Sequence, residues 1–180
     1  MTQSFEIEIV EEYKLSPSYQ KKIAFLLQEA FSDYPKGQYY YNQLPSFRYL
    51  VWNDGQLIAH IGIDHRIINL DHEVFSIFGI IDLCVSKEYQ SQKIASSLLE
   101  NIEKQAKTSK IDFMLLTAEP TNLYTLHGFK LVKNNSKWLM LRNYQSFGVL
   151  HRKLKNCLLY KSVHGKEWKE GTLDFLGTIF

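Results

Sequence analysis

The chain lacks a strong charge of either sign. Its 180 residues carry 21 basic and 19 acidic side chains, which gives a formal net charge of +2. Nucleic acids and anionic membrane surfaces are bound through concentrated positive charge, so this balance argues against both kinds of partner. The sequence also lacks a Gly-x-Gly-x-x-Gly run and a P-loop, which argues against the common nucleotide-binding folds. A small acidic ligand stays compatible with this composition.

Cysteine is scarce, with Cys84 and Cys157 as the only two. Two thiols make no disulfide framework, and Cys84 lies in an apolar run where it is interpreted as a small core residue. This usage fits a reducing cytoplasm, which is the expected location. No Cys-x-x-Cys is present, and His60, His65 and His72 do not have a metal-ligand spacing on strands, so no metal site is expected.

Long apolar runs and linkers are missing as well. Residues 1–14, MTQSFEIEIVEEYK, have neither a basic start nor a long apolar segment, so they predict neither a signal peptide nor a membrane anchor. No stretch rich in Gly, Ser or Pro marks a linker, and no internal repeat is visible. The length is usual for one domain, and we expect a single domain over residues 1–180.

The stretch from residue 77 to 99 contains the clearest pattern. Residues 75–85 are largely apolar and β-branched, which predicts a strand buried on both faces, with Asp82 as an acid inside it. One helical face follows, made of Ile94, Leu98, Ile102 and Ala106. A helix that begins between Gln90 and Lys93, directly after a strand, presents free backbone N–H groups that favour an anion such as phosphate.

The remaining patterns predict alternating strands and helices. Strands are expected at 5–9, 47–52, 57–69, 113–117, 129–133 and 138–142, and helices from Ser16-Pro17 to Asp33 and at 121–126. Asp54-Gly55 predicts a tight hairpin, and strand 138–142 is expected to pair with 129–133. A meander leading into a β-α-β unit gives an α+β fold, with a mixed, mostly antiparallel sheet flanked by helices on both faces. The tail after 143 is expected to pack back on the domain.

A first motif lies at the strand-to-helix turn. Leu83-Cys84-Val85 is followed, after four residues, by the run QSQKIA at 90–95. This pattern resembles the central motif of the GNAT superfamily of acetyl-CoA-dependent N-acetyltransferases: Leu-x-Val, four residues, then Gln/Arg-x-x-Gly-x-Gly/Ala. The resemblance implies acetyl-CoA as co-substrate, with its pantetheine arm along the strand and its pyrophosphate in the turn. The implied binding residues are Leu83, Cys84, Val85, Gln90, Ser91, Gln92, Lys93, Ile94, Ala95 and Ser96.

A second motif, LYTLHGF at 123–129, resembles the family's aromatic-or-Leu, Tyr, three residues, Gly-Phe pattern. Gly128 fits the left-handed residue that ends a helix. The resemblance implies that Tyr124 is the general acid for the departing thiolate, whereas a plain core tyrosine is the alternative role. Asp82 is the candidate general base or amine anchor, because burial raises the pKa of a carboxyl. The alternative for Asp82 is a structural role, capping nearby backbone or pairing with Arg66.

The chain departs from the family at three positions. Lys93 replaces the central glycine, where its side chain either crowds the pyrophosphate or points away and adds a positive charge. Thr117 replaces an asparagine that often precedes the tyrosine, and Pro120 shortens the helix before Tyr124. These departures keep open a non-catalytic module that binds or senses coenzyme A. A faint likeness to the nodulation N-acyltransferases, in AHIG at 59–62 and GIIDL at 79–83, keeps open a longer acyl chain.

The acceptor is not specified by these motifs. The family resemblance implies a small-molecule or peptide amine and leaves a homodimer open as an assembly. The tyrosine-rich segment 34–45 is expected to be a loop or short helix whose rings either cap the edge of the core or line a substrate mouth. The basic cluster HRKLK at 151–155 is interpreted either as a solvated face or as a contact for the 3′-phosphate of the cofactor.

Overall fold

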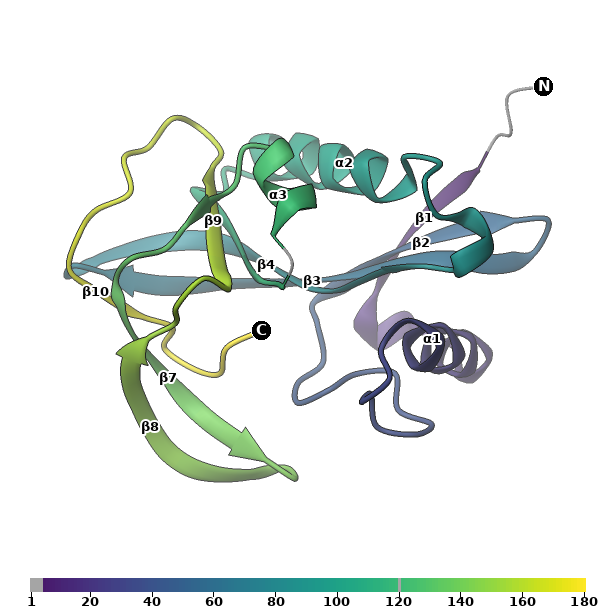
Figure 1. Cartoon of the computed structure of the whole chain (residues 1–180), viewed down its shortest axis with the longest axis horizontal. Coiled ribbons are helices and arrows are strands. Elements are labelled where there is room, and N and C mark those ends of the chain that lie inside the picture. Colours follow the sequence, from purple (N-terminus) through teal and green to yellow (C-terminus); the bar gives the residue numbers. More distant parts are fainter. Residues whose placement is uncertain (1–4, 120) are drawn as a thin grey trace. The chain divides into compact units, whose positions relative to one another are not determined.

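The computed structural model describes residues 5–119 and 121–180, which form two compact units (Figure 1). The first unit contains residues up to Ile63 together with Ile81–Leu99, and the second contains Asp64–Ile80 and Glu100–Phe180. Two strands and one helix run from one unit into the other. The single domain expected from the sequence stays a prediction, and the effect expected of Pro120 lies outside the described residues.

The first unit is built from antiparallel strands and helix α1. Its elements are β1 (Glu6–Glu11), η1 (Glu12–Lys14), α1 (Pro17–Ala30), β2 (Phe47–Asn53), the first part of β3 (Gln56–Leu70), the last part of β4 (Glu73–Val85), η2 (Lys87–Tyr89) and the start of α2 (Ile94–Thr108). The strand order is β1-β2-β3-β4. Ser16 caps α1 by accepting a hydrogen bond from the Tyr19 N–H at 3.2 Å, and Pro17 follows as the first helical residue.

The hairpin between β2 and β3 turns at Asp54 and Gly55, whose φ angles are 49° and 76°. Two positive φ values in succession are what a two-residue hairpin requires, so the predicted turn is confirmed. On one side of these strands α1 packs through Ile23, Leu26 and Leu27. They meet Leu50, Trp52, Leu57 and Cys84.

The edge strand β1 differs from its sequence pattern. Its alternation predicts a wet acidic face, yet Ile7 and Ile9 are 37% and 54% exposed. Glu8, on the other face, accepts a 2.8 Å hydrogen bond from the indole N–H of Trp52. Glu8 thus turns inward, where it satisfies the N–H of the buried Trp52 indole.

The second unit adds strands on both sides of β3 and β4. Its further elements are the rest of α2, β5 (Phe113–Thr117), α3 (Asn122–Leu126), β6 (Lys130–Leu131), β7 (Asn135–Arg142), β8 (Gln145–Lys153), β9 (Leu158–Ser162) and β10 (Thr172–Asp174). The strand order is β6-β9-β5-β4-β3-β10-β7-β8. The pairs β4–β5 and β10–β7 are parallel. The pairs β5–β9, β6–β9, β7–β8 and β3–β10 are antiparallel. The expected α+β fold with a mixed, mostly antiparallel sheet is confirmed.

One predicted strand pairing is wrong. Strand β7 does not pair with the 129–133 segment; it pairs with β8 and β10, and β6 pairs with β9. The reason is a tight turn at Asn143 and Tyr144, whose φ angles of 50° and 58° fold the chain into a β7–β8 hairpin. The sequence pattern predicted no strand over residues 145–153, so β7 had no hairpin partner among the predicted strands.

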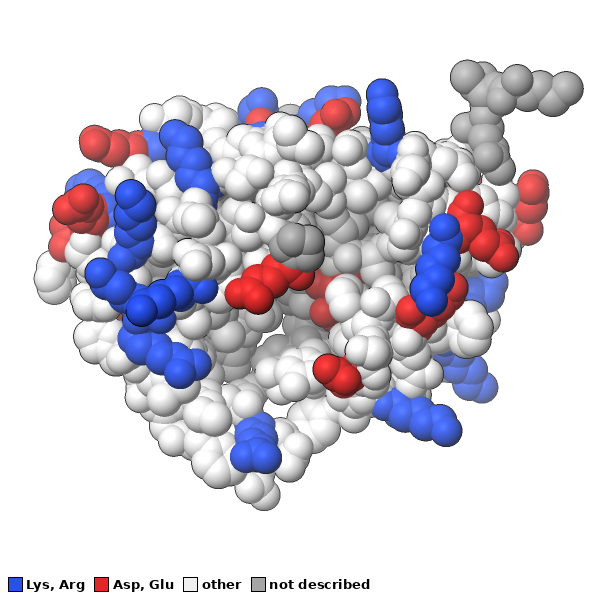
Figure 2. Space-filling model, viewed as in Figure 1, with Lys and Arg blue, Asp and Glu red and all other residues white. Residues whose placement is uncertain are grey.

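The core of the second unit is aromatic. The Phe113 ring lies 5.2 Å from Phe75 and 5.0 Å from Trp168, and Trp168 stacks on Tyr160 at 4.2 Å between centroids. Phe175 is fully buried, so the tail packs back on the chain as predicted. Acidic and basic side chains both occur over the visible face (Figure 2). None of the helices within 5–119 and 121–180 is long and apolar enough to cross a membrane.

Candidate functional site

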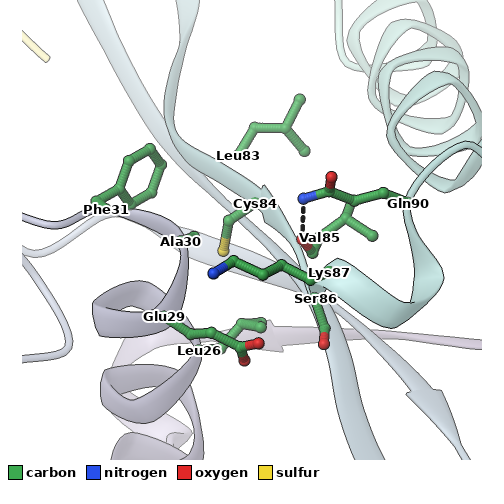
Figure 3. Close-up of a pocket in the computed structure, with 10 residues that line it drawn as sticks. All are labelled: Leu26, Glu29, Ala30, Phe31, Leu83, Cys84, Val85, Ser86, Lys87 and Gln90. Atoms are coloured by element: carbon green, nitrogen blue, oxygen red, sulfur yellow. Dashed lines mark hydrogen bonds between the residues drawn. The ribbon is translucent and has the colours of Figure 1, made fainter.

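The end of β4 and the following turn form the centre of the candidate site. The Ser86 N–H donates to the carbonyl of Ile58 at 2.8 Å, which keeps the strand paired up to the turn. The Gln90 side chain then folds back and donates to the Val85 carbonyl at 3.2 Å (Figure 3). The turn is therefore tied to the strand by its own side chain, and α2 begins at Ile94, directly after the predicted range.

The backbone of this turn is left-handed at two alternate residues. Ser91 has a φ of 64° and Lys93 a φ of 61°. Glycine adopts this region freely, whereas an L-residue is strained there by about 1 kcal/mol, which gives a physical reason for a glycine at the position of Lys93. Alternation of left-handed and ordinary residues turns successive N–H groups to one side, an arrangement that binds anions.

Helix α2 adds its own donors to the turn. Its first intrahelical bond runs from the Ser97 N–H to the Lys93 carbonyl at 2.9 Å. The N–H groups of residues 94–96 precede that bond and have no acceptor within the helix. Ile94 is buried, whereas Ala95 and Ser96 are half-buried and small. These donors and the positive end of the helix dipole suit a phosphate group.

A cavity of about 210 Å³ lies between the end of α1 and β4 (Figure 3). It is lined by Leu26, Glu29, Ala30, Phe31, Leu83, Cys84, Val85, Ser86, Lys87 and Gln90. Three predicted binding residues of β4 are therefore brought together with Gln90 on one wall. Figure 3 shows Lys87 extending across the cavity between Cys84 and Glu29. Glu29 was not singled out by the sequence patterns, because it lies at an ordinary polar position of an amphipathic helix.

Asp82 lies at a kink in β4, one residue before the cavity wall. Its φ of 52° is left-handed, which is unusual for a residue inside a strand. The Tyr34 hydroxyl donates to its Oδ2 at 2.7 Å. Burial raises the pKa of Asp82, while the hydrogen bond from Tyr34 and the positive charge of Arg48 lower it, with burial prevailing. A carboxyl in this environment is suited to proton transfer.

The alternative pairing of Asp82 with Arg66 is wrong. The Arg66 Nε lies 3.3 Å from Asp64 in the second unit, and its guanidinium lies over the rings of Phe175 and Phe180. Asp82 instead takes its hydrogen bond from the tyrosine-rich loop. Tyr34 and Tyr39 pack against the α1 core, whereas Tyr41 is more than half exposed, so the loop both caps the core and presents a ring to solvent.

Three further polar residues form a chain that ends at Asp82, and two of them, Arg48 and Glu12, had not been singled out from the sequence. His60 lies against the Asp82 carbonyl, and Arg48 contacts both His60 and Glu12. The signal for Arg48 was present, since it is a charged residue inside the apolar strand FRYLVW, as Asp82 is in β4. Cys84 is a core residue as predicted, and burial followed by the charge of Asp82 raises the pKa of its thiol.

Tyr124 lies in the second unit, on the short helix α3. Its half-buried ring meets Phe129 edge-to-face at 5.9 Å, and its carbonyl accepts from the Phe129 N–H at 3.1 Å. Gly128, with a φ of 83°, makes the predicted left-handed exit from this helix. The Thr117 hydroxyl donates to the Phe180 carbonyl at 3.4 Å. Residues 151–153 of the basic cluster are exposed on β8.

Comparison with known proteins agrees with this geometry. The model of the acetyltransferase (GNAT) family matches residues 9–131 of the chain. A search of curated proteins found no match. The match includes the β4–α2 turn and both sequence motifs, up to the strand after Gly128.

Solved structures share the fold at low identity. The GNAT family N-acetyltransferase YhbS from Escherichia coli, in complex with CoA, is 14% identical with a TM-score of 0.63, over 97% of this chain and 92% of that one. A GNAT family acetyltransferase from Brucella melitensis, in complex with acetyl-CoA, is 15% identical with a TM-score of 0.59, over 93% and 94%.

A longer relative matches in part. The probable N-acyltransferase from Enterococcus faecalis V583 is 14% identical with a TM-score of 0.56, over 71% of this chain and 32% of that one. The chain thus spans about a third of the length of that relative. With the family model covering most of the chain and the strand-turn-helix geometry in place, the chain belongs to the acetyltransferase (GNAT) family.

Proposed function

We propose that the chain transfers the acetyl group of acetyl-CoA directly to a primary amine of a small-molecule or peptide acceptor. The observation that carries this proposal is the half-buried Asp82 carboxyl, held at the kink directly before the cavity-lining residues Leu83–Val85. A partly buried acid with a raised pKa is suited to take a proton from an ammonium near neutral pH. Catalysis by this residue explains why an acid is kept inside an apolar strand.

The cofactor fits the residues that are present. The backbone of Leu83–Val85 would pair with the pantetheine arm, and the N–H groups from Gln90 to Ser96 would hold the pyrophosphate. The left-handed backbone at Ser91 and Lys93 supports this role, because it turns the amides of the turn to one side. The Lys93 side chain is exposed, so a lysine fits at this position although its backbone has the left-handed conformation that glycine adopts most easily. Bound, acetyl-CoA supplies the activated acetyl thioester.

The reaction divides between two residues. Asp82 takes a proton from the acceptor ammonium, which frees the nitrogen lone pair to form the C–N bond as the C–S bond breaks. Tyr124 gives its phenolic proton to the departing sulfur, the role implied by the family motif. The attacking nitrogen then loses its second proton to the Tyr124 phenolate, and Asp82 releases the first proton to solvent. The acceptor nitrogen ends as an amide and the sulfur as a thiol, both residues return to their starting forms, and protons and electron pairs balance.

The binding step is tested by thermal shift with acetyl-CoA, CoA and octanoyl-CoA. At a ligand concentration about a hundred times its Kd, acetyl-CoA stabilises the fold by about 2.7 kcal/mol. Ser96→Glu, which places a carboxylate at the start of α2, abolishes the shift. Ser18→Glu makes the same change at the start of α1 and leaves the shift intact. Absence of stabilisation by every one of the three ligands overturns the proposal.

The transfer step is tested with acetyl-CoA and a panel of polyamines, amino acids, aminoglycosides and peptide amines, following free thiol and acetylated product. Transfer to at least one class is expected. A larger shift and faster transfer with octanoyl-CoA assign the longer-chain acyltransferase instead. Binding without transfer to any amine assigns the non-catalytic module.

A further inference from the structure

A chain of hydrogen-bonded polar side chains crosses the interior of the first unit. Glu12 receives two hydrogen bonds from Arg48, to Oε2 from Nε at 2.6 Å and to Oε1 from Nη2 at 3.1 Å. The Arg48 Nη1 lies 2.8 Å from the His60 Nε2, and the His60 Nδ1 lies 3.1 Å from the Asp82 carbonyl oxygen. The three links join four residues, each on a different element: η1, β2, β3 and β4.

These groups are too deeply buried to be incidental. Arg48 is 1% exposed and His60 0%. A buried charge or imidazole is costly unless every donor and acceptor is satisfied, and here each group is paired with the next. The Tyr39 ring also lies over the Arg48 guanidinium, 5.5 Å from its centroid. The arrangement therefore has a defined geometry.

The contacts determine the tautomer of His60. An arginine can only donate, so the Nε2 of His60 accepts, and its Nδ1 carries the proton that is donated to Asp82. Burial, followed by the charge of Arg48, lowers the pKa of His60 well below its ordinary value, which keeps the ring neutral. A neutral imidazole with a protonated Nδ1 is therefore the form that both hydrogen bonds of His60 require.

The acceptor of that proton is the backbone at the kink. A left-handed residue interrupts the hydrogen-bond ladder of a strand, because its carbonyl turns away from the neighbouring strand. At Asp82, with a φ of 52°, the His60 imidazole supplies the missing donor. Besides His60, the charged and titratable groups around Asp82 are Tyr34 and Arg48, with Cys84 and Glu29 further along the cavity.

We infer that His60, oriented by Arg48 and Glu12, is a positioning residue that holds the Asp82 backbone in its kinked form and so aims the carboxyl. This inference rests on the catalytic role proposed for Asp82. Tyr34 holds the carboxyl from the loop, and His60 holds the backbone from β3. Two anchors on different elements fix the direction of the side chain, which proton transfer requires to within a fraction of an ångström.

The experiment compares His60→Phe, which fills the space without a donor, with His60→Asn, whose amide N–H restores one. His164→Phe, at an exposed position of the second unit, is the control. His60→Phe lowers kcat about ten- to a hundredfold with the KM for acetyl-CoA unchanged, and His60→Asn recovers most of that loss. Equal loss in both variants that follows their thermal stability, or an unchanged kcat in His60→Phe, overturns the inference.

A second readout is independent of turnover. Nitrogen NMR of His60 shows a protonated Nδ1 in the unmodified chain, and the Cα and Cβ shifts of Asp82 report its left-handed backbone. In His60→Phe those shifts move to extended values, whereas His60→Asn keeps them. If the unmodified chain transfers no acetyl group, the proposed function fails while these shifts still decide whether His60 holds the kink. Asp82 shifts that stay left-handed in His60→Phe overturn the inference.

Discussion

The two units treat polar groups in their interiors differently. In the first unit Arg48 and His60 are buried, and their hydrogen bonds lead to the backbone of Asp82. In the second unit the core around Phe113 is made of aromatic rings that pack edge-to-face against it. Apolar packing contributes stability without directional demands, whereas a buried polar chain contributes geometry and is weak evidence for stability. The first unit therefore contains a hydrogen-bonded chain of defined geometry, whereas aromatic packing dominates the core of the second.

The largest expected effect tests the packing of the second unit. Phe113→Ala removes a fully buried ring that contacts three other aromatic side chains, so the free energy of unfolding falls by about 3–5 kcal/mol. Urea denaturation measures this loss. Phe147→Ala, at a residue 60% exposed on β8, is the matched control and changes it by less than about 0.5 kcal/mol. For Phe113→Ala, a loss below about 1 kcal/mol, which is about a third of the smallest expected loss, would show that the aromatic cluster repacks around the missing ring.

The next effect separates geometry from stability in the first unit. Asp82→Asn removes the base and lowers kcat/KM about a hundredfold or more. The amide oxygen still accepts from Tyr34, so the fold is retained. Steady-state kinetics across pH provide the measurement: in the unmodified enzyme kcat/KM rises as Asp82 loses its proton, and in the variant that limb is absent. A variant with the original profile would remove Asp82 from the mechanism.

Asp82→Asn lowers the activity but is expected to raise the thermal stability of the chain at pH 7. Burial raises the pKa of Asp82 in the folded state above its unfolded value. The folded state then binds the proton more tightly, so the free energy of unfolding falls as pH rises from the unfolded pKa through the folded pKa. Asp82→Asn carries no charge and avoids this loss. Its melting temperature at pH 7 is therefore higher than that of the unmodified chain and equal to it in acid, as calorimetry would show.

A smaller effect is expected from Tyr124→Phe. A thiolate leaves without assistance more readily than an alkoxide, so loss of the phenolic proton lowers kcat only about tenfold. This effect is smaller than the roughly hundredfold or more that a general acid usually contributes. Binding of acetyl-CoA, measured by calorimetric titration, stays unchanged. Tyr144→Phe, on the exposed turn between β7 and β8, serves as the control. Equal kinetics for both variants at several pH values would leave Tyr124 as a packing residue.

The smallest effect concerns the turn before α2. Lys93→Gly relieves a left-handed lysine and raises the free energy of unfolding by up to about 1 kcal/mol. Lys104→Gly makes the same chemical change at an exposed position inside α2 and lowers it by about 1 kcal/mol. Opposite signs in chemical denaturation confirm that backbone conformation causes the difference. A loss in both variants would contradict a strained Lys93.

Local signals were sufficient for much of the fold. Pro17 after Ser16, Gly55 after Asp54 and Gly128 after α3 each specify a backbone conformation with few alternatives, and all three elements begin or end where they indicate. The β7–β8 hairpin was missed because its turn, Asn143-Tyr144, contains no glycine. Its strand β8 is exposed along most of its length, so no alternation of apolar residues marks it.

Taken alone, the sequence determined the strand, turn and helix from Ile77 to Leu99, the acid inside the strand and the family resemblance. These depend on neighbours along the chain, which the order of residues specifies directly. Only the tertiary structure decided that Asp82 is kinked, that Tyr34 holds its carboxyl and that Arg48 and His60 reach its backbone. Those contacts join residues 12 to 48 positions apart, and their pairing depends on how the strands align. The separation of two residues along the chain does not specify how their strands align. Burial and hydrogen-bond geometry select the strand alignment only when the strands pack.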